Sequence, residues 1–206
     1  MTPEDVLNEV ATQVAVCTDC KLNLSRKNAV PGEGPASSDL MFIGEGPGFH
    51  ENEQGRPFVG AAGRFLEELL GSIGMAREDV FIGNVVKCRP PGNRDPEPEE
   101  IAACSKYLKR QIAAINPKVI VTLGRFSMAR YFPDARISRI HGQPKQVDGR
   151  LIVPMYHPAA ALHQPSLRQV VQDDFARLPE LIARGAPETP PTEGSEPTDA
   201  EQLSLF

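Results

Sequence analysis

Four cysteines are placed so that they can hold a metal. Cys17 and Cys20 form a C-x-x-C pair, whereas Cys88 and Cys104 enclose a Pro-rich loop followed by a helix-like run. In a reducing compartment, four thiols are more often metal ligands than two disulfides. Their wide spacing suits a structural zinc or a [4Fe–4S] cluster and does not decide between them. Unrelated buried thiols and a redox pair are the alternatives.

Polar side chains follow three apolar runs that read as buried strands. Glu45 and Gly46 belong to a GEGPG sequence directly after residues 40–43, Asn84 interrupts residues 80–86, and His157 follows residues 151–155. In open parallel sheets, ligands bind at the carboxyl ends of the strands. We therefore expect these side chains to converge on one pocket.

Each polar group has a functional and a purely structural interpretation. The amide of Asn84 can accept and donate, which matches N3–H and O4 of uracil; cytosine needs the reversed orientation, and only a fixed amide discriminates. His157 can donate to a developing oxyanion. Phe58, in GRPFVG, can stack on a planar ligand or cap the core. The structural alternatives are a tight turn at GEGPG, an Asn84 that satisfies backbone groups, and a His157 bonded to its neighbour.

The elements that position these residues alternate along the chain, which predicts an α/β fold. Its architecture is a three-layer α/β/α arrangement around a central four-stranded, mostly parallel sheet. Residues 137–147 read as irregular. The predicted strands cover residues 40–43, 80–86, 118–123 and 151–155, and the predicted helices cover 3–16, 63–73, 98–115, 126–132 and 165–184.

Length and charge indicate one domain, residues 1–184, with a tail, residues 185–206. The tail is rich in Pro, Glu and Thr up to residue 201, which predicts disorder. The net charge of −5 equals the five acids after Arg184, so the body is neutral, which does not exclude DNA binding. No apolar run approaches a membrane span and no signal-peptide pattern is present, so we expect a cytoplasmic monomer that does not bind membranes.

Several ordered motifs together resemble the family 4 uracil-DNA glycosylases, the iron–sulfur class. They are GEGPG (44–48), GRPFVG (55–60), NVVKCRPPGNR (84–94), HPAAAL (157–162) and the four cysteine positions. The resemblance implies an α/β/α fold and a [4Fe–4S] cluster on Cys17, Cys20, Cys88 and Cys104. It also implies binding of uracil-containing DNA, extrusion of the base, and hydrolysis of the N-glycosidic bond of deoxyuridine to leave an abasic site.

The same resemblance implies roles for the site residues. Phe58 stacks on uracil, Asn84 reads its N3–H and O4, His157 bonds O2 and stabilises the leaving anion, and Glu45 and Gly46 line the pocket. The best-known uracil class has an Asp at the position of Gly46, and no obvious general base replaces it here.

Asn93 is the candidate for holding the attacking water, and Glu45, which puts a carboxylate at the end of its strand, is the other catalytic candidate. Leu162 is a candidate wedge into the duplex. Arg89, Arg94, Lys145 and Arg168 are candidate phosphate contacts, although any one such residue is more often an ordinary surface charge.

Two alternatives concern the reaction. Arg139-Ile140-His141 is similar to the motif of a related class that bonds covalently to DNA through its His, but that class has GEQPG and a basic insertion that this chain lacks. Ordinary turnover is therefore favoured over a covalent His141–DNA adduct. A non-catalytic, metal-stabilised DNA-binding domain is the second alternative.

The chain ends in QLSLF, which resembles the pentapeptide that docks bacterial proteins on the replicative sliding clamp. Gln202 would anchor one end, and Leu203, Leu205 and Phe206 would supply the apolar contacts. An acidic tether would give the segment reach. The alternative is a hydrophobic C-terminus that packs on its own domain.

Overall fold

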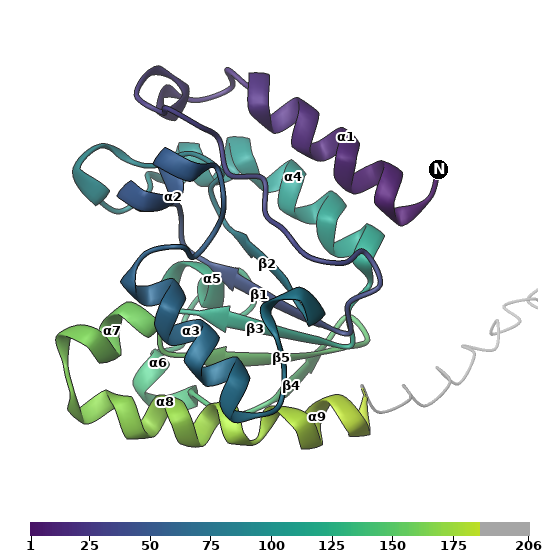
Figure 1. Ribbon diagram of the computed structural model, residues 1–206, viewed down its shortest axis with the longest axis vertical. Helices are drawn as coiled ribbons and strands as arrows, with labels where there is room; N and C mark the ends of the chain where they lie inside the picture. Colours follow the sequence, from purple (N-terminus) through teal and green to yellow (C-terminus); the bar gives the residue numbers. More distant parts are fainter. Residues whose placement is uncertain (186–206) are drawn as a thin grey trace, which may run out of the picture.

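The computed structural model describes residues 1–185, and the predicted clamp-binding segment lies outside them. A five-stranded sheet in the order β2-β1-β3-β5-β4 forms the middle of three layers (Figure 1). Strands β1 (Leu40–Gly44), β2 (Phe81–Asn84), β3 (Val119–Leu123) and β5 (Arg150–Met155) run parallel. The predicted three-layer α/β fold with its four parallel strands is confirmed.

The fifth strand, β4 (Lys145–Val147), pairs antiparallel with β5 at the sheet edge, inside a segment expected to be irregular. A two-residue turn joins the two strands, and both of its residues have positive φ, 50° at Asp148 and 75° at Gly149. Asp-Gly is a preferred sequence for such hairpin turns. The sequence therefore carried a hairpin signal, which the short, polar strand obscured.

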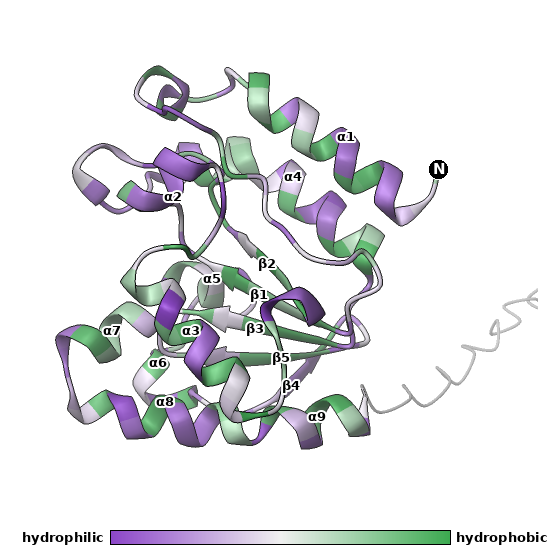
Figure 2. Cartoon of the chain, viewed as in Figure 1, coloured by the Kyte–Doolittle hydropathy of each residue, from purple (hydrophilic) through white to green (hydrophobic). Residues whose placement is uncertain are grey.

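Alternate side chains of the strands face the two helical layers. On β1, Leu40 and Phe42 join the cluster with α3 (Ala61–Ser72), α8 (Ser166–Ala176) and α9 (Leu178–Arg184). Met41 and Ile43 join the opposite cluster with α1 (Pro3–Val16) and α4 (Pro98–Ile115). Figure 2 shows the apolar strands between helices whose outer faces are polar. Each fully buried side chain of this size contributes roughly 1.5–3 kcal/mol, so both faces stabilise the sheet.

Several helix boundaries differ from the prediction. The last predicted helix is two helices, α8 and α9, which meet at Arg177, because Pro179 in the first turn of α9 cannot continue a helix that precedes it. The helix predicted over 126–132 is α5 (Arg125–Ala129). Three short helices were not predicted: α2 (Phe49–Gln54), α6 (Ile137–Ile140) and α7 (Pro158–His163).

Short 3₁₀ turns connect the main elements. They cover Lys21–Leu24 after α1, Arg77–Asp79 before β2 and Pro91–Asn93 after it. Within the described part of the chain, no helix is both long and apolar enough to cross a membrane.

Candidate active site and cysteine cavity

A cavity of about 400 Å³ lies at the carboxyl ends of β1, β2 and β5. Parallel strands end at the same edge of a sheet, so the segments that follow them meet there. The structure brings together all six residues predicted for the substrate site: Glu45, Gly46, Phe58, Asn84, Asn93 and His157. The cavity is also lined by Pro47, Gly48, Glu51, Ala62, Pro90, Arg94 and Ala159.

Asn84 ends β2 opposite Gly44 of β1. Its side chain is buried, and Oδ1 is one of three buried side-chain atoms within residues 1–185 that have no hydrogen-bond partner. A buried acceptor without a partner costs about 1–3 kcal/mol. Because Asn84 lines the cavity, an N–H group of a bound ligand can supply the missing donor.

His157 caps α7, and its Nδ1 accepts the backbone N–H of Ala159 at 3.1 Å. An Nδ1 that accepts is unprotonated, so the neutral imidazole carries its hydrogen on Nε2. Burial lowers the pKa of His157 to about 4, and Glu51 opposes this shift weakly. His157 is therefore a neutral Nε2–H donor at pH 7.

Phe58 presents its ring both to the core and to the cavity. The ring is buried and stacks on His157, with centroids 5.4 Å apart and planes at 24°. Its backbone φ is 51°, in the left-handed region. Phe58 therefore caps the core and also lines the cavity, and its stacking on a planar ligand stays a prediction.

Two carboxylates line the cavity. Glu45 is half-buried; burial raises its pKa, Asp95 adds to the shift and Arg125 opposes it. Glu51, on α2, was not predicted and accepts backbone N–H groups from both sides of the cavity. Glu51 lies in the first turn of α2, where its carboxylate accepts the N–H of the N-cap residue Gly48, and no side chain of a capping motif marks this position in the sequence.

The loop after β2 brings Asn93 to the cavity with a left-handed φ of 56°. Arg89 Nε donates to Asn93 Oδ1 at 2.7 Å, and its guanidinium lies 5.3 Å from the ring centre of Phe49. Arg94 holds both oxygens of buried Glu100, at 2.9 and 2.7 Å. Arg94 therefore fixes this loop to α4 through Glu100.

The other predicted DNA contacts are more dispersed. Leu162 is exposed on α7, in the segment that follows His157. Arg168 pairs with Glu68 at 2.9 Å. Lys145, on the edge strand β4, lies over the ring of Phe132. Neither of these two cations lines the cavity.

His141 is engaged outside the cavity. Its Nδ1 lies 2.8 Å from Asp174 Oδ2 on α8, and its ring lies 5.0 Å from that of Tyr156. Burial raises the pKa of Asp174, and His141 opposes that shift. The residue that would form a covalent adduct is thus held by Asp174 and does not line the cavity.

Cys17, Cys20, Cys88 and Cys104 all line a second, smaller cavity at the end of α1, against the loop after β2 and against α4. Arg26 Nη1 donates to Cys88 Sγ, and the backbone N–H of Lys87 donates to Cys104 Sγ, both at 3.3 Å. Within residues 1–185, no three His, Cys, Asp or Glu side chains form a group that could hold a single metal ion. The structure nevertheless gathers at one cavity four thiols that are far apart in the sequence.

Burial shifts the pKa values of several groups that line this cavity. It raises the pKa of Cys104 to about 11 and also raises the pKa of Cys20 and of Cys88. Lys87 is fully buried beside them, and its Nζ donates to Gln111 Oε1 at 2.7 Å. Desolvation lowers the pKa of Lys87 to about 8, and Cys104 opposes the shift.

Comparison with known proteins identifies the family. Residues 31–178 match the model of the Uracil DNA glycosylase superfamily. The type-4 uracil-DNA glycosylase of Sulfurisphaera tokodaii is 49% identical over 187 residues, covering 86% of this chain and 85% of that protein. The type-4 enzymes of Saccharolobus solfataricus (48% identical; 87% and 88% covered) and Thermotoga maritima (44%; 89% and 98%) match similarly. The chain therefore belongs to the uracil-DNA glycosylase superfamily and, within it, to the type-4 family that its motifs predict.

Proposed function

We propose that the protein is a uracil-DNA glycosylase that hydrolyses the N-glycosidic bond of deoxyuridine in DNA, releasing uracil and leaving an abasic site. The observation that carries the proposal is the unpartnered Oδ1 of Asn84 in the wall of the cavity. Uracil offers a donor, N3–H, beside an acceptor, O4, and the two ends of one amide match that pair. The type-4 relatives support the same substrate.

The remaining residues supply stacking and charge stabilisation. Phe58 stacks on the extruded base, while Glu45 and Gly46 line its edge. When the C1′–N1 bond breaks, its electron pair goes to uracil, and Nε2–H of neutral His157 donates to O2, where the negative charge gathers. A neutral donor suits this step because it stabilises the leaving anion without first having to be protonated at pH 7.

The oxygen of the attacking water bonds to C1′ as the C1′–N1 bond breaks, and the proton that the water releases passes through solvent to the uracil anion, which leaves as neutral uracil. We assign the positioning of this water to Asn93, whose Oδ1 orientation is fixed by Arg89. Glu45 adds a half-buried carboxylate with a raised pKa on the same cavity. Gly46 offers no side chain for the task, so the residues around it must orient the water.

The four cysteines fit a [4Fe–4S] cluster. All four line one cavity, and N–H donors from Arg26 and Lys87 reach two of the sulfurs, as outer-shell groups do at metal–thiolate sites. When bound, the cluster would crosslink the end of α1, the loop after Asn84 and α4. A structural role follows, because the crosslinked loop is the one that brings Asn93 to the substrate cavity.

An oligonucleotide with a single uracil tests the activity. Incubation with the protein followed by alkali should break the strand at the uracil, and Asn84→Ala should abolish the break. An intact strand with the wild-type protein would exclude the glycosylase and favour a non-catalytic DNA-binding domain.

We also propose that residues 202–206, through Gln202, Leu203, Leu205 and Phe206, dock on the bacterial sliding clamp. The proposal rests on the sequence of this segment. Deletion of residues 202–206 should abolish co-elution with the clamp and leave uracil excision from a short oligonucleotide unchanged. Unaltered co-elution of the truncated protein with the clamp would contradict the proposal.

A further inference from the structure

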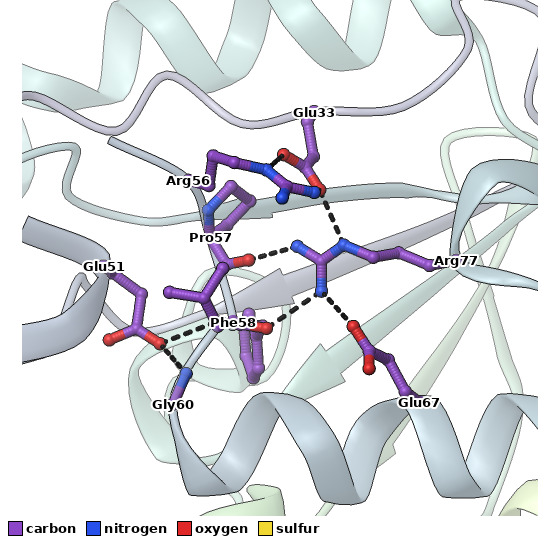
Figure 3. A network of polar contacts seen from close by, with 9 residues as sticks. Glu33, Glu51, Arg56, Pro57, Phe58, Gly60, Glu67 and Arg77 are labelled. Carbon is purple, nitrogen blue, oxygen red and sulfur yellow. Dashed lines mark hydrogen bonds and ion pairs between the residues drawn. The ribbon is translucent and has the colours of Figure 1, made fainter. Parts of the chain in front are cut away.

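The segment from Pro57 to Gly60 carries Phe58, and polar side chains hold it from two sides (Figure 3). The φ of 51° at Phe58 is uncommon for a bulky residue and costs on the order of 1–3 kcal/mol unless the surroundings enforce it. In this backbone conformation the ring is part of the wall of the cavity. The groups that enforce it are therefore part of how the site is built.

Arg77, from the 3₁₀ turn before β2, holds the carbonyl side of the segment. Its Nη1 donates to the Phe58 carbonyl at 2.9 Å, and its Nη2 donates to the Pro57 carbonyl. Its Nε donates to Glu33 Oε1 at 2.6 Å, and its side chain is only 9% exposed. A planar guanidinium can hold several acceptors in fixed directions, so one buried side chain orients two successive peptides.

Glu51 holds the amide side of the same segment. Its Oε1 accepts the N–H groups of Val59 and Gly60, each at 2.9 Å, and its Oε2 accepts the N–H of Gly48 at 3.1 Å. Gly48 belongs to the loop after β1, so this carboxylate joins two of the segments that line the cavity. Charge-assisted bonds of this kind are stronger than neutral ones.

The start of α3 closes the remaining side. A Cβ on Gly63 would lie 1.8 Å from the Phe58 carbonyl oxygen, so only a glycine lets the helix approach that carbonyl. The Phe58 carbonyl is thus approached both by Gly63 and by the guanidinium of Arg77. The ring of Phe58 in turn contacts His157.

We propose that Arg77 and Glu51 are positioning residues that fix the backbone of Phe58 and thereby hold its ring ready for the base. The inference rests on the proposed glycosylase function, in which Phe58 stacks on uracil. Neither residue takes part in the chemistry. Their loss lets the ring move, which weakens binding of the base before it slows cleavage.

The test combines backbone exchange with kinetics in four variants. Arg77→Met removes both carbonyl donors, Arg77→Ala leaves room for a guanidinium ion, and Glu51→Gln removes the charge from the amide side. Arg56→Met is the matched control, because Arg56 pairs with the same Glu33 at 2.8 Å but no contact joins its guanidinium to the Pro57 or Phe58 carbonyl.

In Arg77→Met and Glu51→Gln, hydrogen exchange at the Val59 and Gly60 amides should accelerate, and KM and the inhibition constant of free uracil should rise about tenfold, as expected for one charge-assisted bond. The fall in kcat should be smaller. Millimolar guanidinium should restore KM in Arg77→Ala, and Arg56→Met should match the wild type.

Wild-type exchange at both amides in Arg77→Met and Glu51→Gln would overturn the proposal. So would an activity loss that follows only the folded fraction measured by thermal unfolding, because this pattern indicates stability rather than positioning. The exchange measurement requires no substrate. An inactive wild-type protein would therefore refute the glycosylase function and leave the positioning of Phe58 separately testable.

Discussion

The side-chain oxygen of Asn84 occupies space that a side chain on Gly44 would need. The two residues are register partners at the ends of β2 and β1, and a Cβ on Gly44 would lie 2.4 Å from Asn84 Oδ1. The same Cβ would lie 2.8 Å from the ring of Phe58. One glycine therefore allows the amide and the stacking ring to approach the same point.

Gly44→Ala should reduce excision strongly while the protein stays folded. The added methyl group displaces Asn84 and Phe58 together. A misplacement of roughly 1 Å in an active site costs about 100-fold, here in kcat/KM. Gly71→Ala is the matched control, because a Cβ there meets no atom within 4 Å and lies within α3. The control should keep full activity and gain roughly 0.5–1 kcal/mol of stability. Equal activities of the two variants would contradict the crowding at Gly44.

Asn84→Ala should lose activity without losing stability. The variant loses two hydrogen bonds to uracil, which lowers kcat/KM by about 100-fold or more. It also removes a buried acceptor that has no partner, so the unfolding free energy should stay within about 1 kcal/mol of the wild type. Urea unfolding and single-turnover kinetics check both parts. A large loss of stability would mean that Asn84 serves the fold.

The ionisation of His157 should appear in both spectroscopy and stability. The imidazole titrates near its ordinary value of about 6.5 in the unfolded chain and near 4 in the folded protein. Between these pH values the unfolded state binds more protons, so the contribution of His157 to the unfolding free energy is complete above 6.5 and is lost as the pH falls toward 4. Imidazole ¹⁵N shifts should show the neutral Nε2–H form at pH 6, and an imidazolium there would contradict the assignment.

Cys88→Ala should lose the cluster, stability and activity together. Cys88 is buried in the four-thiol cavity and accepts from Arg26, so its removal affects the end of α1 and the loop that carries Asn93. Iron content, visible absorption and thermal unfolding measure the first two losses. Asn84→Ala is the control that should keep the iron. Full iron content and the wild-type melting temperature in Cys88→Ala would show that Cys88 is not a ligand.

His141→Ala should leave uracil excision unchanged. His141 does not line the cavity, and its main partner is Asp174, so its removal should lower stability by roughly 1–3 kcal/mol through the buried carboxylate that is left. Denaturing electrophoresis should show no DNA-linked protein band in either form. A band in the wild type that disappears in the variant would establish covalent chemistry.

The sequence predicted secondary structure well where apolar residues fill a short segment. Continuous apolar runs predicted the four parallel strands, because strands buried on both faces exclude polar side chains. Polar residues follow three of these strands, and the carboxyl ends of parallel strands share one edge, so Glu45, Asn84 and His157 were expected to meet. The cysteine pattern likewise predicted a common location, since a C-x-x-C pair with two distant thiols is more often a four-thiolate metal site than two disulfides in a reducing compartment.

Other features depend on contacts between distant segments and were not predictable from one sequence. Arg77 looks like a surface residue after a loop, and only the fold places it against the carbonyls of Pro57 and Phe58. Glu51 lies in a stretch that reads as polar loop. The edge strand β4 has too few apolar residues to show a period, so the Asp148-Gly149 turn was its only signal.

The order of the strands also determines when the parts of the protein can assemble during synthesis. The first strand made, β1, lies inside the sheet, between β2 and β3, and β5 joins on the far side of β3. Cys17 and Cys20 leave the ribosome early, but the thiol set is complete only with Cys104, and the cavity only with His157. Synthesis proceeds at about 5–20 residues per second, so several seconds pass between the emergence of the first two thiols and that of Cys104. During that interval the two early thiols are open to oxidation.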